Sequence, residues 1–241
     1  MNIIQYGKPV SRIAPVGCPF ACRAAYTGQD AITGFSAANY LSVADHADLS
    51  VPGTNWLRLF VVKVNAASAT QNVVAQSNWY QPNSFTLIIT AGFFGTIVGG
   101  SGDRYVAYDA GKWYVVAIQR NGADFSMRTA EMGTTNIGYS GTTTTNTANP
   151  VNDLTIGTGS LGDFDGVISD VLYANGTTIS DTDLRAMANG TAMTTLPFYS
   201  SRVFWAILQD TTTTDQTGNH TVTVNGTVTN TDGPPDLYRG I

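Results

Sequence analysis

Charged side chains are scarce in this chain of 241 residues: they make up 12% of it, about half the usual share. The 12 lysines and arginines are scattered singly, so no basic stripe could neutralise a phosphate backbone. No apolar run approaches the roughly 18 residues of a membrane span, and no secretory signal is visible at the start. We therefore expect neither a nucleic-acid nor a membrane partner.

Glutamate is almost absent, since Glu131 is the single one in the chain. Glycan hydrolysis needs two carboxylates about 5 to 9.5 Å apart. Asp163 and Asp165 would share a face of a strand, but Asp165 lies in a Phe-Asp-Gly turn, where a carboxylate ordinarily bonds backbone N–H groups. The sequence also contains no Gly-x-Ser-x-Gly elbow. We expect no enzyme and name no catalytic residue.

Cysteine and histidine occur only twice each. Cys18 and Cys22 are four positions apart, which leaves open a small disulfide loop, half of a metal site, or two small apolar side chains. A zinc site would need two more ligands, and His46 and His220 are isolated and far away in the sequence. We name no metal site and predict no cofactor.

Short segments rich in β-branched and aromatic residues recur from residue 32 onward. Asn121-Gly122 and Asn225-Gly226 have the chemistry of tight hairpins. One helix is indicated at 180–189, where Ser180 can cap the start with Asp183 three positions later. The pattern predicts an all-β, antiparallel two-sheet sandwich with one short helix. We expect strands at 35–43, 56–64, 72–76, 84–90, 105–108, 112–120, 125–128, 154–156, 167–173, 202–209, 220–224 and 226–229.

The first 29 residues differ from the rest because three prolines interrupt any long alternation. We interpret residues 1–29 as an N-terminal arm or as an edge segment folded onto its own domain, and residues 30–241 as a single domain. An extended exit is expected at the C-terminus, where Pro234 and Pro235 restrict the residues before them.

Three segments, taken in order, carry a family resemblance. They are residues 34–50 with Tyr-Leu-Ser-Val, residues 111–117 with Gly-Lys-Trp, and residues 164–184 with Phe-Asp-Gly-Val-Ile. They resemble the laminin-G-like members of the concanavalin A-like jelly-roll superfamily, and the likeness covers about residues 32–190. Residues 205–220 resemble a segment that such domains carry before the first motif. The resemblance therefore implies a jelly roll with a circularly rearranged strand order, which neighbouring termini would permit.

Relatives in this superfamily often hold calcium on the sandwich rim with aspartates and carbonyl groups. Asp103, Asp109 and Asp153 are candidates for such a rim or are simply solvent-facing turn residues. The resemblance leaves calcium open without predicting it.

One loop combines exposed aromatic and amide residues. Trp79 and Tyr80, flanked by Asn78 and Asn83, lie between two expected strands. Such a loop can stack on a sugar, anchor a protein contact or pack internally, and these alternatives stay open. We name these four residues as the candidate binding site.

Proteins resembling this one are frequent among bacteriophage structural genes, so the resemblance implies a function. We expect a non-enzymatic virion structural protein, either a capsid decoration protein or a head or tail appendage, made in the host cytoplasm. It would bind major capsid or other virion proteins through its sandwich surface and its segments 1–29 and 230–241. Sheet edges need covering, which predicts a homo-oligomer. The alternative is a lectin-like carbohydrate-binding module that recognises host-surface glycans.

Overall fold

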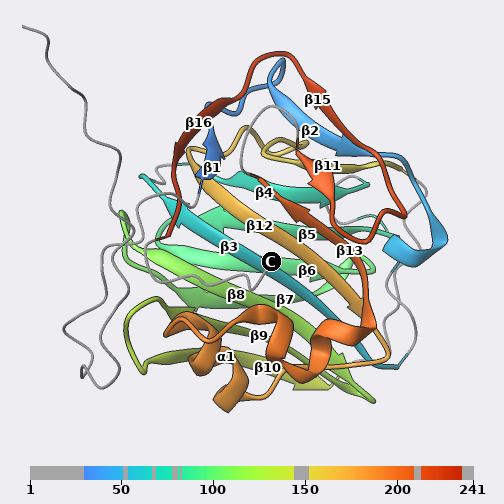
Figure 1. Ribbon diagram of the computed structural model, residues 1–241, viewed down its shortest axis with the longest axis vertical. Helices are drawn as coiled ribbons and strands as arrows, with labels where there is room; N and C mark the ends of the chain where they lie inside the picture. The colour runs from blue at the N-terminus through green and yellow to red at the C-terminus, as the bar shows by residue number, and fades with distance from the viewer. Residues whose placement is uncertain are drawn as a thin grey trace, which may run out of the picture.

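Two antiparallel sheets and one α-helix make up the computed structural model, which describes residues 30–50, 54–66, 69–77, 81, 83–143, 152–208 and 213–234 (Figure 1). The seven-stranded sheet runs in the order β15 (Val222–Asn225), β2 (Tyr40–Val43), β11 (Leu154–Ile156), β4 (Gln71–Gln76), β5 (Phe85–Thr90), β6 (Phe93–Val98), β7 (Ser101–Ala107).

The nine-stranded sheet runs β10 (Ile137–Thr143), β9 (Asp124–Glu131), β8 (Trp113–Asn121), β3 (Trp56–Val64), β12 (Gly166–Asn175), β1 (Asp30–Thr33), β16 (Thr229–Asp232). Two further strands, β13 (Arg202–Ile207) and β14 (Thr214–Asp215), extend it beside β12. The expected all-β sandwich of two antiparallel sheets is confirmed.

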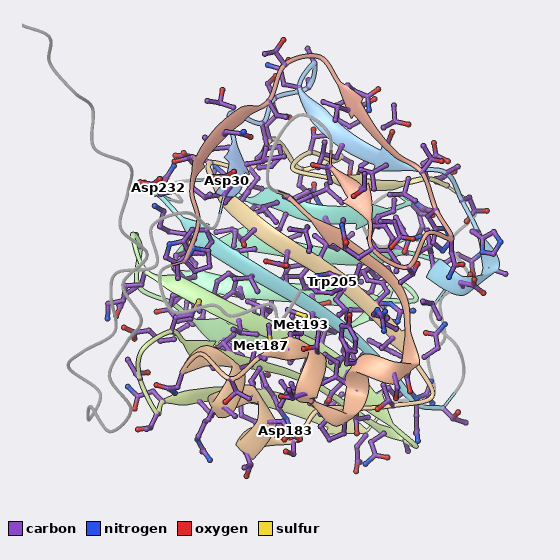
Figure 2. The ribbon with its side chains drawn as sticks, viewed as in Figure 1. Asp30, Asp183, Met187, Met193, Trp205 and Asp232 are labelled. Atoms are coloured by element: carbon purple, nitrogen blue, oxygen red, sulfur yellow. The ribbon has the colours of Figure 1, made fainter. Side chains whose placement is uncertain are left out.

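Strand β3 shows why the nine-stranded sheet has two buried faces. Its side chains alternate, and Phe60 and Val62 enter the core between the sheets. Leu59 and Val61 enter a second core on the opposite face. That second core lies under α1 (Asp181–Ala188) and the short 3₁₀ turns η3 (Met193–Thr195) and η4 (Pro197–Ser201). In Figure 2 the labels of Met187, Met193 and Trp205 mark this layer in front of the sheet.

The helix begins as the sequence predicts. Ser180 caps it by accepting a hydrogen bond from the backbone N–H of Asp183, and its hydroxyl donates back to the Asp183 carboxylate at 2.7 Å. Four strands, β1, β6, β10 and β14, were not expected. Residues 35–43 were expected as one strand, but a β-bridge between Ser36 and Asn39 closes a turn before β2 begins.

The two Asn-Gly pairs behave differently. Asn121-Gly122 joins β8 to β9 as a tight hairpin, with Asn121 opposite Asp124. The expected hairpin at Asn225-Gly226 is wrong, because β15 pairs with β2 in one sheet and β16 pairs with β1 in the other. At Gly226 the φ angle is +69° and a Cβ atom would collide with the Ala38 carbonyl, so close approach of two loops requires the glycine.

The first and last described strands are neighbours. β1 pairs with β16 so that Asp30 lies opposite Asp232, and Figure 2 shows these two residues side by side. The neighbouring termini and the circular rearrangement stay predictions. The predicted arm, residues 1–29, and the end of the exit, residues 235–241, lie outside the described residues. None of the described helices is long and apolar enough to cross a membrane.

Candidate functional site

The aromatic loop predicted to bind lies between β4 and β5. Asn83 is the one residue of the candidate set that the structure describes, and it is exposed in a turn just before β5. Asn78, Trp79 and Tyr80 fall outside the described residues. Their role in binding therefore stays a prediction.

The two aspartates considered for catalysis precede β12 and are not part of a strand. They line a shallow hollow of about 310 Å³ with residues 33–35. The Asp163 carboxylate accepts a hydrogen bond from the Thr158 hydroxyl at 2.6 Å. The Asp165 carboxylate accepts one from the Asn65 side-chain amide at 3.1 Å, whereas the turn pattern predicted a bond from a backbone N–H group. Each carboxylate thus has a structural partner that holds a loop.

The single glutamate is part of an ion-pair cluster where β9 ends and β8 begins. Lys112 Nζ lies 2.9 Å from Glu131 and 3.0 Å from Asp109. The hydrogen bond to Glu131, and then the one to Asp109, raise the pKa of Lys112 above its ordinary value. Asp153, another rim candidate for calcium, accepts a hydrogen bond from the backbone N–H of Asp45. The side chain of Asp103 is outside the described part of the chain.

A buried arginine ties the segment after β2 to the sheet. Arg58 has no solvent exposure, and its guanidinium donates to the carbonyl groups of Leu57 and Ala174, to the Asn175 side chain and to the Ser50 carbonyl. The Asn175 amide in turn donates to the Asp48 carbonyl at 3.0 Å. These bonds fix η2 (Ala47–Leu49), a 3₁₀ turn, against the end of β12.

His46 and His220, isolated in the sequence, meet at this place. Their rings lie 5.0 Å apart in an edge-to-face arrangement. His46 precedes η2, and its Nδ1 lies 3.3 Å from the Asp48 carboxylate. His46, Asp48 and His220 each offer a ligand atom, and these three atoms lie within 4.8 Å of one another. Sequence reasoning missed this cluster, because His220 lies more than 170 positions after His46 and Asp48 in the chain and no local pattern joins them.

The loop that carries His220 is organised by Asp215. This nearly buried carboxylate accepts hydrogen bonds from the backbone N–H groups of Trp205, Thr217, Asn219 and His220. It also accepts one from the Thr217 hydroxyl. The Asp-x-Thr-Gly-Asn-His pattern therefore encodes a folded loop whose last residue has a fixed backbone position.

Three large hydrophobic side chains are exposed in the described part of the chain, and all are aromatic: Phe93, Tyr105 and Tyr139. Phe93 and Tyr105 lie diagonally on adjacent strands of the seven-stranded sheet, on the face turned away from the core. Tyr139 lies on β10, where the Arg128 guanidinium is 5.5 Å from its ring centre. Arg128 also pairs with Asp181 at 2.9 Å.

Similarity to known proteins is confined to solved structures, since no family model and no curated protein matches the chain. A heptameric SAP-like pentraxin from Limulus polyphemus aligns with a TM-score of 0.52 and 12% identity, over 81% of this chain and 93% of that one. Domains LG4-5 of mouse laminin alpha1 align with a TM-score of 0.45 and 17% identity, over 70% and 48%. The tailspike protein 2 of bacteriophage CBA120 aligns with a TM-score of 0.45 and 16% identity, over 69% and 27%.

At such identities the likeness establishes the fold alone. The chain adopts a jelly-roll sandwich of the kind seen in the Limulus pentraxin, and the expected jelly-roll fold is confirmed.

Proposed function

We propose that this chain is a non-enzymatic bacteriophage virion protein, a capsid decoration protein or a head or tail appendage, that binds virion partners through its sandwich surface. The exposed pair Phe93 and Tyr105 carries the binding part of the proposal. Aromatic side chains supply most of the binding free energy in protein interfaces, and weakly charged surfaces favour such contacts. The virion assignment rests on the sequence resemblance, which is an argument by analogy.

The local structure makes this pair a firm platform. The Tyr105 ring lies over Gly95, where a Cβ atom would be only 2.7 Å from it, and Ile88 lies beneath the same position. Phe93 is 43% exposed and Tyr105 is 41% exposed, so each side chain is partly packed and partly accessible to a partner. Rings held in this way lose little conformational entropy when a partner covers them.

A second candidate function is glycan recognition, which Tyr139 favours. Its side chain is 62% exposed, and the Arg128–Asp181 ion pair lies beside it. An aromatic ring can stack on the apolar face of a sugar while flanking charged groups bond its hydroxyls. Tyr139 lies on the nine-stranded sheet, whereas Phe93 and Tyr105 lie on the seven-stranded sheet, so the two functions use different surfaces.

The two candidates are separated by paired binding assays on the full chain. Co-sedimentation with purified particles of the virus that encodes it should be saturable, lost in a Phe93→Ser/Tyr105→Ser variant and retained in Tyr139→Ser. A glycan array tests the second candidate with the same proteins, and circular dichroism checks their folding. Glycan binding that Tyr139→Ser abolishes, without any particle association, would overturn the virion proposal. Light scattering in solution tests the proposed homo-oligomer.

A further inference from the structure

We propose that His46, Asp48 and His220 form a binding site for a divalent transition-metal ion, Zn²⁺ by preference, that clamps the segment after β2 to the loop before β15. The inference does not depend on the proposed function. Two imidazoles and one carboxylate are a donor set that suits zinc and its neighbours better than calcium, which prefers oxygen ligands alone.

Strand pairing explains why the two histidines meet. β2 and β15 are antiparallel, with Val43 opposite Val222. Continuing that register by two residues places position 45 opposite His220, so the chain at His46 passes beside His220 just beyond the paired strands, where the two rings meet. In Figure 1 the blue segment after β2 and the red segment before β15 run alongside each other at the right-hand edge.

The contacts of His46 favour a cation at this position. Its Nδ1 lies 3.3 Å from the backbone nitrogen of Asp48 and also 3.3 Å from the Asp48 carboxylate. One imidazole nitrogen cannot accept the amide hydrogen and donate a hydrogen to the carboxylate at once. When Nδ1 is unprotonated, it and the Asp48 carboxylate oxygen are two acceptors 3.3 Å apart, and a metal ion bound by both atoms removes that repulsion and replaces the hydrogen bond from the Asp48 N–H.

His220 supplies an independent observation. Its Nε2 is shielded from solvent and has no hydrogen-bond partner among the described residues, although the ring is only half-buried. The ring is held at the edge of Phe204, with their centroids 5.8 Å apart, and Asp215 fixes its backbone. A shielded ring nitrogen without a partner is unfavourable, so a ligand at this position stabilises the folded loop.

The surrounding charge is also suited to a cation. Asp45 adjoins His46 in the sequence, and its backbone N–H bonds the Asp153 carboxylate, so two more acidic groups lie on this rim. No lysine or arginine of the described ranges forms an ion pair with Asp45, Asp48 or Asp153. The backbone behind the ligands is anchored, because Arg58 bonds the Ser50 carbonyl and Asn175 bonds that of Asp48.

Three protein ligands leave one position of a tetrahedral zinc ion for water or for an atom of a partner. His46 and Asp48 are both about half exposed, so the ion can enter from solvent. The site thus acts as a removable clamp between an early and a late segment of the chain.

Zinc binding is tested by equilibrium dialysis of the tag-free, chelator-treated full chain against zinc chloride. One zinc ion per chain is expected, and because the chain contains two histidines, His46→Asn and His220→Asn should each weaken binding at least tenfold. Cys18→Ser/Cys22→Ser is the matched control, since thiolates also bind zinc, and it should keep full affinity. The melting temperature should rise by about 5 to 10 °C at a hundredfold excess of zinc over Kd.

Asp48→Asn provides a third variant if a histidine substitution prevents folding, and circular dichroism in chelator identifies that case. A tetrahedral absorption spectrum with cobalt chloride should appear in the native chain and disappear in the same variants. No zinc bound at millimolar concentration, or binding that survives the histidine substitutions and is lost with the cysteines, would overturn the proposal.

Discussion

Replacing Arg58 by methionine tests whether a buried, unpaired cation holds this sandwich together. Desolvation lowers the pKa of Arg58 to about 10, and the nearby Tyr173 opposes that shift. Relative to the ordinary value of 12.5, this corresponds to a net unfavourable contribution of about 3 kcal/mol for the charged form, of which desolvation is the larger part. A methionine of similar length would avoid that cost, and such replacements of buried charges are often neutral or stabilising.

Four hydrogen bonds and two aromatic rings act in the opposite direction. The guanidinium donates three bonds of 3.0 Å and one of 2.5 Å, and it lies 4.3 Å from the Tyr173 ring centre and 5.6 Å from that of Trp56. A bond from a charged donor contributes about 1.5 to 3 kcal/mol. Because Nη1 has two hydrogens for its three acceptors, we count three full bonds, which give about 4.5 kcal/mol at the lower limit, and the buried ring contacts add about 2 kcal/mol; together they exceed the desolvation cost.

Arg58→Met should therefore destabilise the protein by about 3 kcal/mol and lower its melting temperature by roughly 6 to 12 °C. Urea unfolding followed by tryptophan fluorescence measures the change. Arg202→Met is the matched control: Arg202 also stacks on a ring, 3.8 Å from the centre of Tyr199, but it is partly exposed and should cost less than about 1 kcal/mol. An Arg58→Met protein as stable as the native chain would refute the assignment of net stabilisation to these bonds.

Three further substitutions address single contacts. Tyr173→Phe removes a buried hydroxyl without a hydrogen-bond partner, so stability at pH 7 should stay within about 1 kcal/mol or rise. Burial raises the pKa of the Tyr173 phenol. The protonated phenol therefore favours the folded state below pH 10, and this contribution is lost at higher pH. Between pH 8 and pH 11, the urea midpoint should fall less in Tyr173→Phe than in the native chain. Asp232 lies opposite Asp30, so Asp232→Lys turns a like-charge pair into an opposite-charge pair and should raise the free energy of unfolding by about 0.5 kcal/mol. A lower free energy of unfolding in low salt would contradict this. Asp215→Asn should lower the free energy of unfolding by about 2 to 3 kcal/mol in the same urea assay, because the asparagine NH₂ group would replace a carboxylate oxygen that accepts hydrogen bonds from backbone N–H groups. An unchanged urea midpoint would refute this.

The strands that the sequence predicted well are those composed almost entirely of β-branched and apolar residues, which are buried in a folded protein. β3 is predicted to the residue, because a run of β-branched and aromatic residues has no other stable location. β6 and β10 were missed because glycines interrupt them. Those glycines are required by packing: a Cβ atom at Gly95 would press on Tyr105, and one at Gly138 would collide with Val106. The glycines of β6 and β10 therefore mark places where a side chain packs closely against the backbone, although glycine is more typical of turns.

Turn chemistry predicts a local bend but does not decide which strands pair afterwards. Gly122 and Gly226 have similar positive φ angles of +61° and +69°. After Gly122 the chain returns along β8, whereas after Gly226 it crosses to the other sheet and joins β1. The difference depends on where β1 and β2 already lie, which is long-range information that the two-residue signal does not contain.

The same long-range pairing accounts for the His46, Asp48 and His220 cluster. The sequence showed the loop of residues 215–220 as a family-like segment in an unusual position, but it did not show what lies beside that loop. β15 is the edge strand of its sheet and its residues are partly exposed, so it buries little apolar surface to hold it against β2. A metal ion bound at the open end of this strand pair stabilises the edge where hydrophobic packing is weakest. The segment of β15 and β16 is therefore held at both ends, by β16 pairing with β1 and by the histidine clamp beyond β15.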